Sequence, residues 1–177
     1  MNVRLIWRRD RYLRGTDSLS FQGHGYPAAR ISEPRENFNH EHQNTRVVNG
    51  VQLGDLIQYV DFDYVARVAK VNGAALWALA SSPSTPKNLL IHVAPPANFA
   101  GINNTVLSWN ANPESNLAGY EVVMRETTVP DWTSAIKVGN VTTATLDTAK
   151  DNLQFGVRAV DTAGNRSPVA FPTTVTT

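Results

Sequence analysis

Residues 107–127 read LSWNANPESNLAGYEVVMRET, and residues 155–168 read FGVRAVDTAGNRSP. In both stretches apolar side chains alternate with polar ones, and a turn sequence bounds each run, at 110–113 and at 162–165. Alternation with a period of two, bounded by Asn, Pro and Gly, is typical of half-buried β-strands. Residues 87–177 therefore predict seven or so short strands in about 90 residues.

Strands of this number and length, joined by short turns, predict an all-β sandwich of the immunoglobulin-like kind. The chain has no cysteine, which excludes a disulfide framework, a thiolate metal site and a cysteine nucleophile. The two quoted stretches resemble the second and third strands, and the sixth strand with its exit turn, of a fibronectin type III domain. That resemblance covers residues 88–177.

The composition of the chain changes near residues 81–87, which read SSPSTPK. Nine of the twelve arginines precede residue 87, whereas thirteen of the sixteen threonines follow it. Serine, threonine and proline bury little and favour extended backbone, so we interpret residues 83–87 as a short semi-rigid linker. The predicted organisation is a first domain over 1–82 and the sandwich over 88–177.

The first half has an α/β pattern. Residues 3–7 and 28–32 predict two strands, a short helix capped by Asp17 or Ser18 lies between them, and residues 33–50 form a polar loop. Apolar residues then recur at helical spacing and predict a helix of about five turns, at Val60, Tyr64, Val68, Val71, Ala75 and Leu79. Two strands are too few for an independent sheet covered on both faces. We therefore expect the incomplete C-terminal portion of a larger α/β domain, with the chain beginning inside it.

The charge of the chain is nearly balanced, with 16 basic and 15 acidic residues and a formal net charge of +1. Such a balance argues against nucleic acid as a partner. No stretch approaches the roughly 20 apolar residues that a membrane-spanning helix needs. The first residues also lack the apolar core of a signal peptide.

The polar loop holds two of the four histidines, His40 and His42, which flank a glutamate and follow Glu33 and Glu36. Imidazole and carboxylate groups are ligands for zinc, although this spacing alone is a weak indication. The remaining histidines, at 24 and 92, have no histidine or carboxylate close to them in sequence, and no role is assigned to them.

The surrounding segment, RGTDSLSFQGHGYPAARISEPRENFNHEHQNTR at 14–46, resembles the C-terminal portion of the zinc-dependent aminopeptidases of peptidase family M twenty-eight. The resemblance covers about residues 3–82 and places Asp17 on the turn aspartate that organises the site from beneath. It places residues 25–28 on the Gly-x-Pro-Ala step of that family and His42 on the last metal-binding histidine. The residues that flank Asp17 and follow His42 depart from the family pattern, so His40 stays the alternative ligand.

This resemblance implies a secreted or periplasmic exopeptidase that removes N-terminal residues from peptides with metal-activated water. A two-metal hydrolase holds its ions about 3.5–4 Å apart and needs several ligands for each. The family's other ligands and its glutamate general base lie upstream of the matched region. This chain would therefore supply at most one zinc ligand and no catalytic residue, and we expect it to be inactive alone.

Three further residues are candidates for the substrate cleft because they precede the metal histidine: Glu33, Glu36 and Phe38. A solvated loop is the alternative interpretation of the same residues. A different class of function also fits the sequence, namely a non-catalytic binding or structural protein. In that case the sandwich would serve as the module that contacts another protein or a cell surface.

Overall fold

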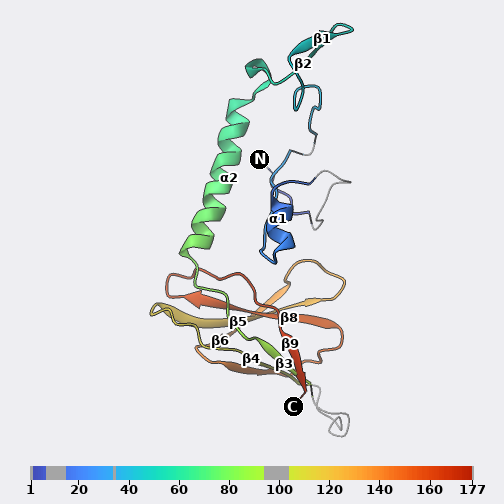
Figure 1. The fold of residues 1–177 in the computed structure, drawn as a ribbon. Coiled ribbons are helices and arrows are strands. Elements are labelled where there is room, and N and C mark those ends of the chain that lie inside the picture. The colour runs from blue at the N-terminus through green and yellow to red at the C-terminus, as the bar shows by residue number, and fades with distance from the viewer. Residues whose placement is uncertain (1, 7–14, 34, 94–103, 177) are drawn as a thin grey trace. The chain divides into compact units, whose positions relative to one another are not determined.

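The computed structural model of the chain describes residues 2–6, 15–33, 35–93 and 104–176. Its contacts form two compact units, Met1–Val71 and Asn72–Thr177, and each is described here by itself (Figure 1). The division falls inside a long helix rather than in the 83–87 segment. The domain boundaries proposed from composition stay a prediction.

The second unit is a β-sandwich. Its strands are β3 (Leu90–Val93), β4 (Thr105–Ser108), β5 (Leu117–Glu126), β6 (Ser134–Gly139), β7 (Thr143–Leu146), β8 (Leu153–Asp161) and β9 (Thr173–Thr176). They form a four-stranded sheet in the order β7-β4-β3-β9 and a three-stranded sheet in the order β6-β5-β8, which Figure 1 shows as two layers. All neighbouring strands are antiparallel except β3 and β9. The predicted alternating strands and the predicted sandwich are confirmed.

The core of the sandwich is built from the alternating apolar positions of its strands. The cluster of buried core residues comprises Leu89, Leu107, Trp109, Tyr120, Val122, Ala144, Leu146, Phe155, Val157, Ala159 and Ala170. Trp109 packs edge-on against Tyr120, with 5.3 Å between the ring centroids. Full burial of each large apolar side chain contributes about 1.5–3 kcal/mol. The second unit therefore contains a hydrophobic core of its own.

The Ser- and Pro-rich segment before β3 lies against this sandwich. Pro83 and Pro86 are buried. Between them the Ser84 amide donates to Oε1 of Glu114 at 2.7 Å, the Ser84 hydroxyl donates to the same oxygen, and Asn112 Nδ2 donates to the Ser84 carbonyl at 2.7 Å. Hydrogen bonds from the Ser84 hydroxyl and amide lower the pKa of Glu114 to about 2. The segment is thus fixed to the loop between β4 and β5.

The first unit contains short elements that surround the polar loop. They are α1 (Ser18–Gly23), β1 (Arg46–Val48), β2 (Val51–Leu53) and the 3-10 helix η1 (Ile57–Tyr59). Helix α1 confirms the predicted short helix, and Gly25 follows it with a φ of 82°. Glycine adopts this left-handed conformation without the steric cost that other residues incur.

Helix α2 (Phe62–Ser81) confirms the predicted helix of about five turns. The Asp61 carboxylate accepts a hydrogen bond from the Tyr64 amide at 2.8 Å and so caps its first turn. None of its residues is buried, and the side chain of Trp77 is 76% exposed. Among the described residues, no helix has the length and apolar character needed to cross a membrane.

Three expectations for the first half are wrong. Residues 3–6 and 28–32 are not strands, and Trp7 lies outside the described residues. An isolated strand leaves its amides and carbonyls unpaired, and the described residues offer these two segments no neighbouring strand. The loop over 33–50 also contains β1 of the β1–β2 hairpin, turned by Asn49 and Gly50 with φ values of 50° and 77°. These angles fit the two-residue hairpin turn that Asn-Gly favours.

Candidate functional site

The loop with the two histidines is closed at its base by a glycine. The Gly54 amide donates to the Asn39 carbonyl at 2.9 Å, which joins the loop to the end of the hairpin. A Cβ on Gly54 would lie 2.7 Å from the Thr45 Cα, and the φ of Gly54 is 111°. Only glycine allows this close approach of two backbone segments. Residues 39–54 are therefore held as one closed loop.

The His40 ring is held by two neighbours. It stacks on Tyr59 with 3.6 Å between centroids and an interplanar angle of 6°. The Asn37 Oδ1 accepts from the Asn39 amide at 3.1 Å, which turns Asn37 Nδ2 toward His40 Nδ1 at 3.2 Å. Because an amide NH₂ can only donate, Nδ1 accepts and a neutral ring carries its proton on Nε2. In this arrangement His40 has no nitrogen lone pair left for a metal.

His42 is described by its exposure and its backbone. Its side chain is exposed, and its backbone has a φ of 50°. A non-glycine residue in this left-handed region costs of order 1–3 kcal/mol, and such residues are concentrated at functional sites. His42 therefore presents an exposed imidazole on a backbone of unusual conformation.

The other predicted residues do not form a metal site with His42. The Glu36 carboxylate pairs with Arg30 at 3.1 Å, while Glu33 and Phe38 are exposed. Asp17 precedes α1 and makes no side-chain capping hydrogen bond. Within the described ranges no three His, Asp or Glu side chains are close enough together to hold a metal ion.

A structural zinc site requires four protein ligands, and a catalytic site requires about three. The described residues do not meet this requirement, so they do not form a zinc site by themselves. His42 has the donor chemistry of one ligand, and the remaining ligands would have to come from outside the described residues.

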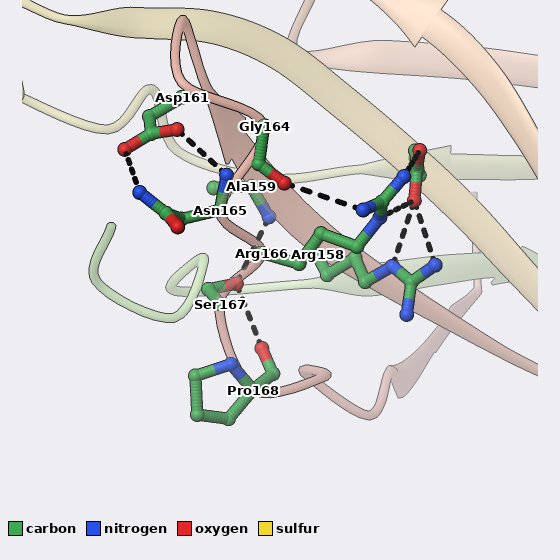
Figure 2. A network of polar contacts seen from close by, with 9 residues as sticks. Arg158, Ala159, Asp161, Gly164, Asn165, Arg166, Ser167 and Pro168 are labelled. Carbon is green, nitrogen blue, oxygen red and sulfur yellow. Dashed lines mark hydrogen bonds and ion pairs between the residues drawn. The ribbon is translucent and has the colours of Figure 1, made fainter. Parts of the chain in front are cut away.

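The sandwich carries a separate charged network on the outer face of its three-stranded sheet. Glu121 accepts from Arg158 Nε at 2.8 Å and from Arg166 Nε at 3.0 Å (Figure 2). Hydrogen bonds from Arg166, followed by those from Arg158, lower the pKa of this buried carboxyl, so it is ionised at neutral pH. Pairing with Glu121 in turn raises the pKa of Arg166. The sequence analysis did not identify this site. Its signal was a charged residue at an outward-facing position of each alternating strand, Glu121 in β5 and Arg158 in β8.

The turn after β8 positions Arg166. The Asp161 carboxylate accepts from the Asn165 amide at 2.8 Å and from Asn165 Nδ2 at 2.9 Å (Figure 2). It also accepts from the Ala163 amide at 3.0 Å. The Asn165 side chain is the main cause of the lowered pKa of Asp161. Arg166 Nη1 then donates to the Gly164 carbonyl at 3.2 Å. The turn predicted at 162–165 is thus confirmed, and it fixes the guanidinium beside Glu121.

The relatives found by comparison with known proteins are named as probable zinc metalloproteases. A protein of Pyrenophora teres f. teres named "Probable zinc metalloprotease" is 46% identical over 172 residues, which are 97% of this chain and 35% of that protein. Proteins named as probable zinc metalloproteases in Leptosphaeria maculans and Pyricularia oryzae are also 46% identical over 97% of this chain, which spans 39% and 34% of their lengths. This chain therefore spans between about a third and two fifths of the length of these relatives. No protein-family profile matches it.

Solved structures similar to part of this chain include two whose titles name an Fn3 domain or an Fn3-like protein. An Fn3-like protein from Clostridium thermocellum is 21% identical, with a TM-score of 0.38, over 55% of this chain and 96% of that one. The fn3 domain of human collagen alpha-1(XX) is 20% identical, with a TM-score of 0.39, over 55% of this chain and 90% of that one.

Proposed function

We propose that this chain is the C-terminal part of a zinc metallo-aminopeptidase, in which residues 1–82 complete the catalytic domain and residues 88–177 form an accessory sandwich. One observation carries the proposal. The 46% identity to proteins named as probable zinc metalloproteases extends over 97% of this chain, and so includes both the histidine loop and the sandwich. Removal of N-terminal residues from peptides, and a secreted or periplasmic location, rest on the resemblance of residues 14–46 to the aminopeptidase segment.

The C-terminal half of helix α2 supports this proposal. Residues 71–80 of α2 contain no charged side chain, and Leu76, Trp77 and Leu79 are 68%, 76% and 59% exposed. A helix that is apolar on all sides is usually buried in a larger protein. By contrast, every buried hydrophobic residue of the described chain lies at or after Leu89. We infer that the remainder of the enzyme covers α2.

In this proposal His42 is the one zinc ligand that the chain contributes. Its loop is closed by Gly54, its side chain is exposed, and its backbone is held in a left-handed conformation. By the aminopeptidase resemblance, Asp17 holds the turn before α1, where its carbonyl accepts from the Ser20 amide at 3.1 Å, and Glu33, Glu36 and Phe38 border the substrate cleft of the complete enzyme. The carboxylate base that activates water for peptide hydrolysis is supplied by the rest of the enzyme.

Zinc titration by calorimetry tests the proposal, with the intact chain, its His42→Ala variant and a matched His40→Ala variant. We expect weak zinc binding and no hydrolysis of an aminoacyl anilide, because a lone imidazole is an incomplete site. Tight stoichiometric binding that His42→Ala abolishes, or any turnover, would show that a complete site exists in this chain. The assignment of the missing ligands to another part of the enzyme would then be wrong.

A further inference from the structure

The basic residues of the sandwich gather on one face. Residues 87–177 contain six basic and seven acidic residues, so this half carries a net charge of −1. Core-facing residues of β5 and β8 alternate with outward-facing ones, and the outward set includes Arg125 and Arg158. The register pairs Glu121 with Lys137 on one side and with Arg158 on the other. Glu121 is the only acidic residue at an outward position of these three strands.

The single carboxylate does not neutralise this face. Glu121 is 3% exposed and lies between two guanidinium groups, whose side chains are 24% exposed in Arg158 and 46% exposed in Arg166. One carboxylate balances one of these two charges, and Lys137 makes no ion pair with any residue that the structure describes. Together with Arg125, the four basic residues exceed the Glu121 charge by three, and the exposed Glu126 and Asp131, next in sequence to Arg125 and Trp132, reduce this excess to +1. The buried carboxylate also fixes the guanidinium groups before any ligand arrives.

An aromatic surface adjoins these cations. The Trp132 ring lies over Gly156, where an added Cβ would be 3.3 Å from Trp132 Cη2. Arg125 lies over the same ring at 5.4 Å, and Phe171 packs on it with 5.5 Å between centroids. The pair of Gly156 with Val123 lies two residues along the strands from the pair of Arg158 with Glu121, a distance of about 7 Å. The aromatic and cationic groups therefore share one surface.

The ring of Phe171 is available to a ligand, because the side chain is 63% exposed. It also forms one wall of a hollow of about 490 Å³ whose polar lining residues are Asn88 and Thr173. An exposed aromatic ring beside hydroxyl and amide groups offers a stacking surface for a sugar ring and hydrogen bonds for its hydroxyls. The Arg125 guanidinium, which lies over the Trp132 ring that Phe171 packs on, favours a carboxylate on that sugar.

We propose that this basic aromatic face, formed by Arg125, Lys137, Arg158, Arg166, Trp132 and Phe171, binds an acidic polysaccharide of the uronic-acid type. The excess of positive charge on an otherwise acidic domain selects an anionic partner. The exposed aromatic ring favours a carbohydrate over an acidic peptide, which would use the cations alone. The site is separate from the proposed peptidase chemistry and would hold the enzyme on a polysaccharide matrix.

Affinity electrophoresis of the full chain tests this proposal, in gels that contain polygalacturonate, neutral dextran or poly-L-glutamate at low salt. Polygalacturonate should retard the chain, and added salt should weaken the retardation because it screens the charges. Dextran should not retard it, and poly-L-glutamate should do so at least about threefold more weakly than polygalacturonate.

Two variants test the face, and a third variant serves as the matched control. Lys137→Glu and Phe171→Ala should each weaken polygalacturonate binding at least about threefold. Phe171→Ala should leave the weaker poly-L-glutamate binding unchanged. Lys150→Glu makes the same charge change away from this face and should retain binding. Lys150 donates to the Asn104 carbonyl, just before β4 of the four-stranded sheet. Thermal melting within a few degrees of the parent chain confirms that each variant is folded.

Several results would overturn the proposal. Equal retardation of the parent chain and both folded face variants would exclude this face, and an equal loss in Lys150→Glu would indicate a general charge effect. Retardation by poly-L-glutamate that equals that by polygalacturonate would assign the face to an acidic protein. Absence of retardation by polygalacturonate would exclude an acidic polysaccharide.

Discussion

The buried carboxylate of Glu121 gives the sharpest prediction for the stability of the sandwich. Glu121→Gln keeps the volume of the side chain but replaces one acceptor oxygen with an NH₂ group. The oxygen Oε2 accepts from Arg158 Nε and Arg166 Nε, and Oε1 accepts from Arg166 Nη2, so either orientation of the amide loses at least one of these hydrogen bonds. The substitution also leaves two cations beside each other without a counter-charge.

Removing one partner of a buried ion pair typically costs about 3–5 kcal/mol. The arginine side chains are 24% and 46% exposed, so water screens them in part and we expect about 2–3 kcal/mol. For a domain of 60–100 residues, 1 kcal/mol shifts Tm by about 4–8 °C, which predicts a decrease of about 8–24 °C. Urea unfolding followed by tryptophan fluorescence, to which the buried Trp109 contributes, measures the difference in the free energy of unfolding.

The pH dependence of this difference has a defined sign. The pKa of Glu121 is lowered from 4.5 in the folded chain, so its stabilising contribution is present above pH 4.5. That contribution is lost as pH falls through the lowered pKa, and the parent and Glu121→Gln chains should then converge in stability. A difference below about 0.5 kcal/mol at pH 7, or one that does not change between pH 7 and pH 3, would refute the electrostatic account of this network.

Three further predictions concern other parts of the chain. Glu114→Gln should speed hydrogen exchange of the Ser84 amide at pH 7, because this amide donates to the Glu114 carboxylate. In the parent chain the protection of the Ser84 amide should be lost as pH falls from 4.5 toward the Glu114 pKa of about 2. NMR measures both exchange rates. Gly54→Ala should open the histidine loop, because its Cβ would lie 2.7 Å from the Thr45 Cα. Limited proteolysis should then cut residues 39–54 faster in this variant than in a Gly73→Ala control. The Cβ added at Gly73 meets no atom within 4 Å. Hydrogen exchange over the full chain should show strong protection in β5 and β8 and weak protection in residues 71–80 of α2, and equal protection of these segments would contradict the inference that α2 needs a covering partner.

The parts of the fold that sequence patterns predict are those with local causes. The alternation in 117–126 and 153–161 and the helical spacing in 62–81 each arise from one face of a single element. The same alternation over residues 3–7 predicts a strand that is not formed at residues 3–6, because a strand also requires a hydrogen-bonded neighbour. The hairpin at Asn49 and Gly50 carried a local turn signal that the polarity of its surroundings obscured.

The candidate sites depend more on contacts between distant segments. His40 and His42 have the same local composition around them, and only the stacking of His40 on Tyr59 and its bond from Asn37 separate their roles. The meeting of Glu121 with Arg166 likewise depends on strand register and on the turn after β8. Neither feature can be predicted from the spacing of residues along the chain.

The central claim is tested most directly in a longer protein. A chimera would replace the matching segment of the Pyrenophora teres relative, which is 46% identical over 172 residues, with this chain. Zinc content and hydrolysis of an aminoacyl anilide would be measured for the relative, the chimera, and the His42→Ala and His40→Ala chimeras. We predict that the chimera hydrolyses the anilide, that His42→Ala removes up to one zinc ion per chain and lowers the rate at least about tenfold, and that His40→Ala retains both. Full zinc content and activity in His42→Ala, or their loss only in His40→Ala, would contradict the account.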